Sequence, residues 1–484
     1  MSTVLSKKEK EEEFYIDDYL NKIKSGKLKT NKIHSLSNSE LFLKLCQDVQ
    51  LHFEIQFKNN EGQESKVLES QTKAIIGIPE YVKYFKDIIR KYLEDNSKFN
   101  TPYPKWYKSL VDGIFHEVWG LAGISKWMDM AESQSAKIIG DRIYFLIDGK
   151  MILQEQKISE GRFNALKKAL LLLTPEVSQS RPNIEILMHS GERVTIYDKP
   201  LTKGNQHIMV FRKYVVEIYT LEEQARRNTI PKEAIPMLKS FAKVGFNILF
   251  CGAVRTAKTT MLTIFQLLEN PELEGVLIET NSEIPLHKLM PNSPIMQLVA
   301  DGKALDNITK QLMRSDGDYI VCGEARDGNM LNMLVETANR GTRHCKSTVH
   351  LTDVFDLPYD IANMIVNSKG GSLEHTITKV VKSFHYVFEF IQLTDRSKKR
   401  LKGIYEIRFE HITLRISIHK ICSYNFDSDS WAFAYDVGGD KEAIAREENF
   451  QAFLSFKKEL KKLAKKFPME NYVVRFPFYS KVRS

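Results

Sequence analysis

The sequence predicts an α/β fold, in which a parallel-containing sheet follows a smaller α+β domain and a helical leader. Apolar strand patterns alternate with helix patterns over residues 246–351, which indicates a parallel sheet because parallel neighbours need crossover connections. Upstream, short β-rich runs with turn residues fill residues 135–217. Residues 1–110 are rich in lysine, glutamate and leucine at helical spacing, interrupted by a loop pattern at 57–66.

Length and composition limit the classes of protein to which this chain can belong. A chain of 484 residues holds about three domains, and 43% hydrophobic with 27% charged residues is typical of a globular protein. No apolar run reaches the ~18 residues needed to span a bilayer, and the charged start does not resemble a signal peptide. Five scattered cysteines without C-x-x-C spacing favour a reducing compartment over a zinc site or a disulfide framework. We therefore expect a cytoplasmic protein.

Four segments follow from these patterns: a helical leader (1–112), an α+β domain (113–218), an α/β domain (219–425) and a C-terminal tail (426–484). Gly140-Asp141 and Asp148-Gly149 are turn signals of the kind found in hairpins. The run Thr220-Leu-Glu-Glu223 is a capping-box pattern, which predicts a helix start at the edge of the third segment.

The net charge of +9 is compatible with nucleic acid or an anionic membrane surface as a partner, without indicating either. Basic clusters at 396–402 and 456–466 are interpreted as solvated turns or helix faces. Residues 450–467 predict an amphipathic basic helix, whose apolar face holds Phe456, Leu460, Leu463 and Phe467. We expect this helix to pack on the preceding domain, with contact to an anionic membrane or a partner as the alternatives.

The stretch "NILFCGAVRTAKTTML" (247–262) approaches a phosphate-binding loop. An apolar strand precedes the loop and a helical pattern follows it, which would bring backbone N–H groups and the positive helix end to a phosphate. Lys258 would reach the phosphates and Thr259 would bind Mg²⁺. Ala257 stands where the motif has glycine, so a chance match is the alternative interpretation.

Carboxylates end two further predicted strands. Glu324 follows the apolar run of "DYIVCGEARD", where Gly323 allows a close approach, and Glu279 ends "GVLIE" with Glu283 four residues on. The carboxyl ends of parallel strands border the crevice in which such sheets bind ligands. In "STVH", Thr348 and His350 share one side of a strand. Taken singly, each of these residues is also what an ordinary strand end or a structural histidine would look like.

Taken together, "GAVRTAKTT", "IETNSEI", "MRSDGDYIVCGEARD" and "STVH" resemble the Walker A, Asp box, Walker B and His box of the secretion ATPase superfamily, in the same order. These are the ring-forming motors of type II and type IV secretion, type IV pili and Flp/Tad pili. The resemblance covers roughly residues 115–425. It looks closest to the Flp/Tad and type IV secretion branch, because no tetracysteine zinc insertion is present.

The resemblance implies a RecA-like P-loop ATPase domain, a homohexameric ring, and ATP with Mg²⁺ as cofactors. ATP is then bound by Gly252, Ala253, Val254, Arg255, Thr256, Ala257, Lys258, Thr259 and Thr260, and by Arg193 and Arg212 of the preceding domain. Mg²⁺ is bound by Thr259 and Glu324. The implied catalytic residues are Glu279, Glu283, Arg314, Glu324, Arg326 and His350.

Three positions depart from the family pattern. Ala257 replaces a glycine, Thr280 replaces the Asp-box aspartate, and Thr342 replaces the first histidine of the His box, with His344 two residues on. If the loop needs a positive φ at position 257, the Cβ costs about 1–2 kcal/mol, which corresponds to roughly tenfold in nucleotide affinity. We expect slowed rather than abolished hydrolysis, because Lys258, Thr259 and Glu324 are retained.

The sequence thus predicts an ATP-hydrolysing motor subunit of a secretion, pilus-assembly or conjugation apparatus, peripheral at the cytoplasmic face of the membrane. Its expected partners are its own copies and an inner-membrane platform protein. A nucleotide-binding ring scaffold with weak or no hydrolysis is the alternative, motivated by the three departures. A nucleic-acid motor is less favoured, and no stable nucleic-acid binding is expected, since basic strands interleaved with aromatic residues are lacking.

Overall fold

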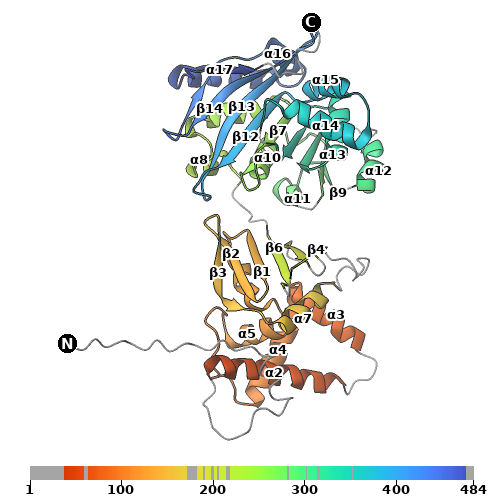
Figure 1. Ribbon diagram of the computed structural model, residues 1–484, viewed down its shortest axis with the longest axis vertical. Coiled ribbons are helices and arrows are strands. Elements are labelled where there is room, and N and C mark those ends of the chain that lie inside the picture. The colour runs from red at the N-terminus through yellow and green to blue at the C-terminus, as the bar shows by residue number, and fades with distance from the viewer. Residues whose placement is uncertain are drawn as a thin grey trace, which may run out of the picture. The chain divides into compact units, whose positions relative to one another are not determined.

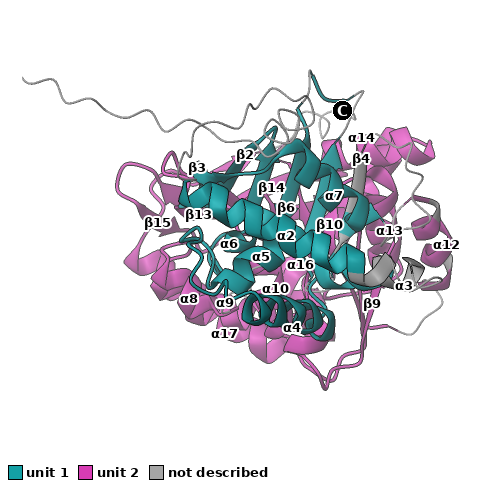
Figure 2. Ribbon diagram, turned by 90° about the horizontal axis from the view of Figure 1, so that it is seen from below, with its two compact units in different colours: residues 1–216 teal, residues 217–484 magenta. Residues whose placement is uncertain are grey.

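The structure, a computed structural model, describes residues 37–58, 64–171, 183–188, 191–197, 201–203, 206–213, 219–280, 283–300, 302–312, 317–351 and 353–475. The chain divides into two compact units, Met1–Val216 and Glu217–Ser484 (Figure 2). Arg314 lies outside the described residues, as do residues 59–63 of the loop expected at 57–66.

From residue 37 on, the described part of the first unit starts with four helices that share a core: α2 (Asn38–Lys58), α3 (Glu64–Ile75), α4 (Pro79–Asp95) and α5 (Leu110–Val118). Helix α4 begins with proline at its first turn, and Ser109 caps α5 by accepting the backbone N–H of Asp112. The buried rings of Phe85 and Trp119 lie 4.8 Å apart. Helix α5 runs through residues 112 and 113, so the helical part continues to Val118.

An antiparallel sheet completes the first unit, in the order β3-β2-β1-β6-β5-β4. Its strands are β1 (Ser135–Ile139), β2 (Arg142–Ile147), β3 (Lys150–Lys157), β4 (Asn183–Leu187), β5 (Arg193–Tyr197) and β6 (Ile208–Arg212), accompanied by η1 (Ala122–Ile124), α6 (Ser125–Met128) and α7 (Glu160–Leu171). The two expected hairpin turns are present, with positive φ at Gly140, Asp148 and Gly149. Alternate strand residues such as Ala136, Ile138 and Phe211 are buried in a core beneath the sheet.

The second unit is built on one large sheet (Figure 1). Among the described residues, its main path runs β15-β14-β13-β12-β7-β11-β10-β8-β9. The strands are β7 (Ile248–Cys251), β8 (Gly275–Glu279), β9 (Ile295–Val299), β10 (Tyr319–Ala325), β11 (Lys346–Val349), β12 (Tyr386–Gln392), β13 (Lys399–Glu410), β14 (Arg415–Asn425), β15 (Ser430–Phe433) and β16 (Val474–Arg475), which pairs with β14. The strands from β12 to β9 pair in parallel, and those from β12 to β15 pair antiparallel. The predicted α/β class with a parallel-containing sheet is confirmed.

Helices cover both faces of this sheet (Figure 1). They are α8 (Leu221–Arg226), η2 (Lys232–Ala234), α9 (Ile235–Ala242), α10 (Lys258–Leu267), α11 (Leu286–Leu289), α12 (Gly302–Leu312), α13 (Gly328–Asn339), α14 (Leu357–Lys369), α15 (Leu373–Ser383), α16 (Gly439–Glu447) and α17 (Phe450–Lys466). Strand β7 is buried on both sides: Ile248 and Phe250 join one core and Leu249 and Cys251 the other. The Thr220 hydroxyl accepts the Glu223 backbone N–H, which is the N-cap that the sequence predicts for α8.

The basic amphipathic helix of the tail is α17, and it packs against α9. Phe453, Phe456, Leu460 and Leu463 are buried in the same core as β7, while most of the lysines are exposed. The rings of Phe456 and Phe241 lie 5.1 Å apart in an edge-on arrangement. The tail therefore contributes to the core of the second unit.

Candidate active site

The loop between β7 and α10 has an unusual backbone. Gly252, Arg255 and Ala257 all have positive φ, at 136°, 65° and 75°. Such alternation turns successive backbone N–H groups toward one concave side, the arrangement that binds anions. Ala257 is left-handed (φ 75°, ψ 16°) and directly precedes the first residue of α10. The position therefore does require the conformation that glycine adopts without strain.

Gly252 is required by packing as well as by its φ. A Cβ at this position would lie 2.1 Å from the carbonyl oxygen of Phe390 on β12. No side chain fits such a contact with backbone, so the loop begins in close contact with its neighbouring strand.

The side chains of Thr256 and Lys258, at the C-terminal end of the loop, hydrogen-bond back to its beginning. The Thr256 hydroxyl donates to the carbonyl of Ala253 (2.9 Å), and Lys258 Nζ donates to the same carbonyl (2.6 Å). Lys258 is only 5% exposed. Burial lowers the pKa of its ammonium to about 8, and the negative charge of Glu324 opposes that shift. The loop lysine and the carboxylate of β10 therefore share one electrostatic environment.

Glu324 extends from β10 between two basic side chains. Its carboxylate lies 2.5 Å from His350 Nε2 and 2.6 Å from the guanidinium of Arg326. Burial alone would raise the pKa of Glu324, but the hydrogen bonds from His350 and Arg326 outweigh it and lower the pKa to about 2. The carboxylate is thus ionised at neutral pH. The structure brings together Glu324, Arg326 and His350, three residues that the sequence analysis singled out.

Thr348 fixes the strand that leads to His350. Its buried hydroxyl donates to the Gly323 carbonyl across the β10–β11 pair (2.7 Å). His350 follows the end of β11 directly, so this bond sets where the histidine leaves the sheet.

Glu279 is buried at the end of β8, beside Gly323. One oxygen accepts the backbone N–H groups of Glu283 and Ile284, both at 3.0 Å, so the side chain organises the loop after β8. Desolvation dominates over these two bonds and raises the pKa of Glu279 to about 8. A Cβ on Gly323 would lie 2.9 Å from both Cγ and Oε1 of Glu279, which explains the glycine in "CGEA".

For the other candidate nucleotide-binding residues, the structure gives burial and position in the fold. Thr259 and Thr260 are partly buried in the first turn of α10, and Val254 is exposed at the tip of the loop. The side chains of Arg193 and Arg212 belong to the first unit, where the two residues are register partners on β5 and β6. The phosphate loop belongs to the second unit, so these arginines and the loop are parts of different units.

A buried ionic cluster behind the loop was not recognised in the sequence. Lys346 Nζ lies 2.6 Å from Glu269, and His344 bridges Glu269 (2.9 Å) and Glu448 (3.2 Å). Burial opposes the charge on His344, but its two carboxylate partners raise its pKa to about 9. Glu269 follows α10, so the cluster ties the helix of the phosphate loop to β11 and to the segment before α17. The only sequence signal was His344 itself, two residues beyond the expected His-box position.

The basic run at 396–402 is less solvated than expected. Arg400 is buried and pairs with Asp429 through Nε (2.7 Å) and Nη2 (2.9 Å), and Lys402 pairs with buried Glu389 (2.6 Å). Both partners are distant in sequence, so a local pattern could not reveal them. Interpreting the whole run as a solvated turn was wrong for these two residues.

All five cysteines are buried and unpaired. In the part of the chain that the structure describes, three or more metal-ligating side chains are nowhere grouped in a way that would hold a metal. None of the helices within the described ranges combines the length and apolarity that crossing a bilayer requires.

No curated protein matches the chain. One similar structure is the VirB11 ATPase of the Brucella suis type IV secretion system in complex with sulphate, with 15% identity, 58% of this chain and 92% of that chain covered, and a TM-score of 0.32. Another is the Legionella pneumophila ATPase DotB, with 14% identity, 71% of this chain and 88% of that chain covered, and a TM-score of 0.42. A third is the pilus retraction motor PilT with bound ADP, with 12% identity, 72% of this chain and 93% of that chain covered, and a TM-score of 0.41.

The family described as type II/IV secretion system protein matches residues 193–431. This stretch contains the phosphate loop, Glu279, Glu324 and His350. The match assigns residues 193–431 of the chain to the family described as type II/IV secretion system protein.

Proposed function

We propose that this chain is an ATP-hydrolysing motor subunit of a secretion, pilus-assembly or conjugation apparatus, closest to the Flp/Tad and type IV secretion branch. It would act as a homohexamer on the cytoplasmic face of the membrane, against an inner-membrane platform protein. The observation that carries the proposal is the Glu324–His350 pair at the carboxyl edge of the parallel sheet, whose negative charge acts on the buried ammonium of Lys258. The family match over residues 193–431 supports it.

The residues present fit ATP and Mg²⁺. The alternating backbone of residues 252–257 offers N–H groups to phosphates, and the buried ammonium of Lys258 adds a positive charge. The Thr259 hydroxyl and the ionised Glu324 are oxygen ligands of the kind that Mg²⁺ prefers. The metal would supply neutralisation of the developing phosphoryl charge.

The other polar side chains would position and neutralise rather than form covalent bonds. Glu324, held by His350 and Arg326, would orient the attacking water, and His350 would approach the terminal phosphate. Glu279 accepts the backbone N–H of Glu283 and so fixes the loop that carries this second carboxylate. Arg314, Arg193 and Arg212 are proposed to reach the nucleotide when domains or subunits close.

Steady-state ATP turnover of the purified chain tests the proposal, with Lys258→Ala and Glu324→Gln as inactive controls. We expect measurable turnover that both substitutions reduce at least a hundredfold. A wild-type rate equal to that of both variants, also with the membrane partner supplied, would contradict the motor proposal.

A scaffold that binds nucleotide with weak or no hydrolysis is a second candidate, favoured by the strained backbone of Ala257. It predicts ATP-dependent assembly of the ring without turnover. Size-exclusion chromatography coupled to light scattering, run with ATP and with a non-hydrolysable analogue, separates the two. Equal assembly with both compounds and no phosphate release would favour the scaffold.

A further inference from the structure

A closed ionic cluster lies at the amino edge of the large sheet, where β11 begins. Lys346, the first residue of β11, is 1% exposed, and its ammonium lies 2.6 Å from the Glu269 carboxylate. The ammonium also donates to the Gln266 side chain (3.2 Å) and to the His344 carbonyl (3.0 Å), so all three of its N–H groups have acceptors. We call Glu269, His344, Lys346 and Glu448 the amino-edge cluster.

His344 belongs to the cluster as a cation. Its Nδ1 lies 2.9 Å from Glu269 and its Nε2 lies 3.2 Å from Glu448. Only the doubly protonated imidazole donates from both nitrogens, so two carboxylate partners require the charged form. Burial opposes this charge, but the hydrogen bonds to the two carboxylates outweigh burial and raise the pKa of His344 to about 9.

The backbone is shaped to admit these contacts. His344 has a left-handed φ of 56°, which is uncommon for a residue with a Cβ, and its N–H donates to the Gly245 carbonyl (3.1 Å). A Cβ on Gly245 would lie 2.9 Å from both His344 Nε2 and Glu448 Cβ. A strained backbone of this kind persists only where the surrounding contacts hold it.

Asn247, which is fully buried, joins the starts of β7 and β11 beside the cluster. Its side-chain oxygen accepts the N–H of Cys345 (3.0 Å), and its amide donates to the carbonyls of Thr342 (3.3 Å) and Ser383 (2.8 Å). The amino edge is therefore tied by charges and by neutral hydrogen bonds.

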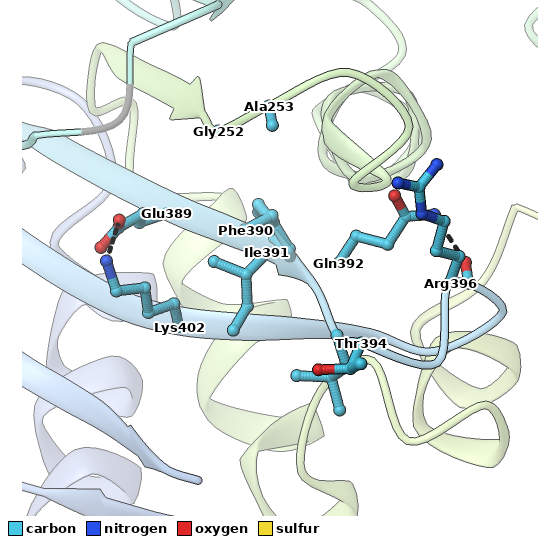
Figure 3. Close-up of a pocket in the computed structure, with 10 residues that line it drawn as sticks. Gly252, Ala253, Glu389, Phe390, Ile391, Gln392, Thr394, Arg396 and Lys402 are labelled. Atoms are coloured by element: carbon cyan, nitrogen blue, oxygen red, sulfur yellow. Dashed lines mark hydrogen bonds and ion pairs between the residues drawn. The ribbon is translucent and has the colours of Figure 1, made fainter.

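The carboxyl edge of the same sheet contains open space. A pocket of about 540 Å³ lies between the start of the phosphate loop, at Gly252 and Ala253, and the hairpin that follows β12 (Figure 3). Packing on this side of the loop is incomplete, so the placement of the loop relative to His350 depends on how α10 and β11 are held at their other ends.

Two stiff elements lead from the amino-edge cluster to the candidate active site. Helix α10 has Lys258 at its first position, and Glu269 lies two residues beyond its last. Strand β11 begins at Lys346, and His350 follows its last residue directly. A helix of 10 residues and a strand of 4 residues are short rods, about 15 Å and about 13 Å long. A change at the cluster therefore shifts the phosphate loop relative to His350.

We propose that the amino-edge cluster positions His350, and through it Glu324, against the phosphates of the bound nucleotide, and that it does so only while His344 is positively charged. The cluster lies at the opposite edge of the sheet from the site, so its members are positioning residues. Glu448 lies between α16 and α17, and through it the tail takes part in setting the geometry for hydrolysis. This inference rests on the proposed function, because it concerns the rate of that reaction.

Further titratable groups border the cluster. Arg343 pairs with Glu447 (3.9 Å), and the ring of Tyr319 on β10 lies 6.0 Å from Lys346 Nζ. Burial raises the pKa of Tyr319 further above its ordinary value, and arginine stays charged throughout. His344 is thus the member whose charge is expected to change as the pH rises through about 9.

The kcat for ATP and the ATP affinity of the full chain, measured from about pH 6.5 to about pH 10, test the inference. His344→Gln removes the charge at every pH, whereas His344→Lys keeps a cation over most of this range. Glu448→Gln removes one of the two carboxylates that favour the cation. Lys369→Met is the matched control, because it breaks an exposed ion pair with Asp306 (2.8 Å) in the same unit.

We expect His344→Gln to lower kcat about tenfold at neutral pH and to change ATP affinity less than about threefold, because the loop itself is intact. The ratio of wild-type kcat to His344→Lys kcat should be constant below about pH 8 and fall about tenfold toward about pH 10. Lys258, whose pKa is about 8, titrates in both chains, so its effect cancels in this ratio. In Glu448→Gln the fall should begin at lower pH, and Lys369→Met should match wild type.

A ratio that does not change with pH, or an affinity loss in His344→Gln as large as its loss in kcat, overturns this inference and leaves the proposed function in place. If thermal unfolding shows that His344→Lys does not fold, wild type and Glu448→Gln decide, and identical pH profiles of these two overturn the inference. A wild-type chain without ATP turnover at any pH overturns the proposed function and this inference together.

Discussion

Glu324 Oε1 lies 2.5 Å from His350 Nε2, which joins the ends of β10 and β11 at the edge of the sheet where the phosphate loop begins. The contact, together with Arg326, keeps a half-buried carboxylate ionised and fixes its direction. A carboxylate with a pKa near 2 is a weak base, so its place in the proposed reaction is orientation and charge rather than proton abstraction.

We expect His350→Ala to lower kcat roughly a hundredfold, because Glu324 loses the partner that directs it. Nucleotide affinity should change little, since Lys258 and the loop backbone are untouched. Turnover and binding measured separately test the prediction. His375→Ala, an exposed histidine on α15, is the control and should retain full activity. A decrease in affinity as large as the decrease in kcat would contradict this role.

Ala257→Gly should stabilise the chain by about 1 kcal/mol, because the left-handed conformation at this position strains any residue with a Cβ. The strain is present in the folded chain, so relief should appear as a higher free energy of unfolding rather than as tighter binding. This refines the tenfold affinity effect expected from the sequence. Urea denaturation and ATP titration measure the two quantities. Unchanged stability with tenfold tighter binding would mean that the loop relaxes when nucleotide leaves.

Gly323→Ala should displace Glu279 and impair turnover severely, because the new methyl group would lie 2.9 Å from two atoms of that side chain. We expect a loss of about 1–3 kcal/mol in stability as well. Gly317→Ala is the matched control: it precedes the same strand, and its Cβ would meet nothing closer than 3.9 Å. Thermal unfolding and ATPase assays distinguish the two variants. Equal behaviour of both would contradict the steric argument.

Stability should fall as the pH rises through about 9, because the ion pairs of His344 raise its folded-state pKa above the ordinary value of 6.5. The contribution is complete below pH 6.5 and is lost by the time His344 is neutral, at most about 3 kcal/mol. His344→Gln should flatten the pH dependence of the free energy of unfolding between pH 7 and 10. His411→Gln, exposed between β13 and β14, should leave the wild-type slope. An unaltered slope in His344→Gln would contradict the assignment.

The parts of the fold that the sequence predicts are those set by neighbours along the chain. The strand before Lys258 is continuously apolar, and the helix after it repeats apolar residues every three to four positions, so both were predictable. The Thr220 cap and the hairpin turns have local chemical causes of the same kind. The family resemblance then selected Glu279, Glu324 and His350 as site residues that accompany the loop.

Contacts between distant residues could not be predicted in this way. Lys346 and Glu269 are 77 positions apart, and each alone is an ordinary charged residue that is usually exposed. Arg400 belongs to a strongly basic run, and nothing near it in sequence indicates burial against Asp429. The pocket beside Gly252 depends on the hairpin after β12 returning past the loop, which only the assembled sheet shows.

The packing of α17 on α9 has a consequence for synthesis on the ribosome. Phe241 is synthesised some two hundred residues before Phe456, the ring that it contacts in the folded unit. During that time Phe241 lacks this contact. The first unit contains its own cores and can fold during that interval. The core of the second unit cannot be completed until residues 450–466 have left the ribosome, so apolar surface of α9 stays uncovered until the chain is almost finished.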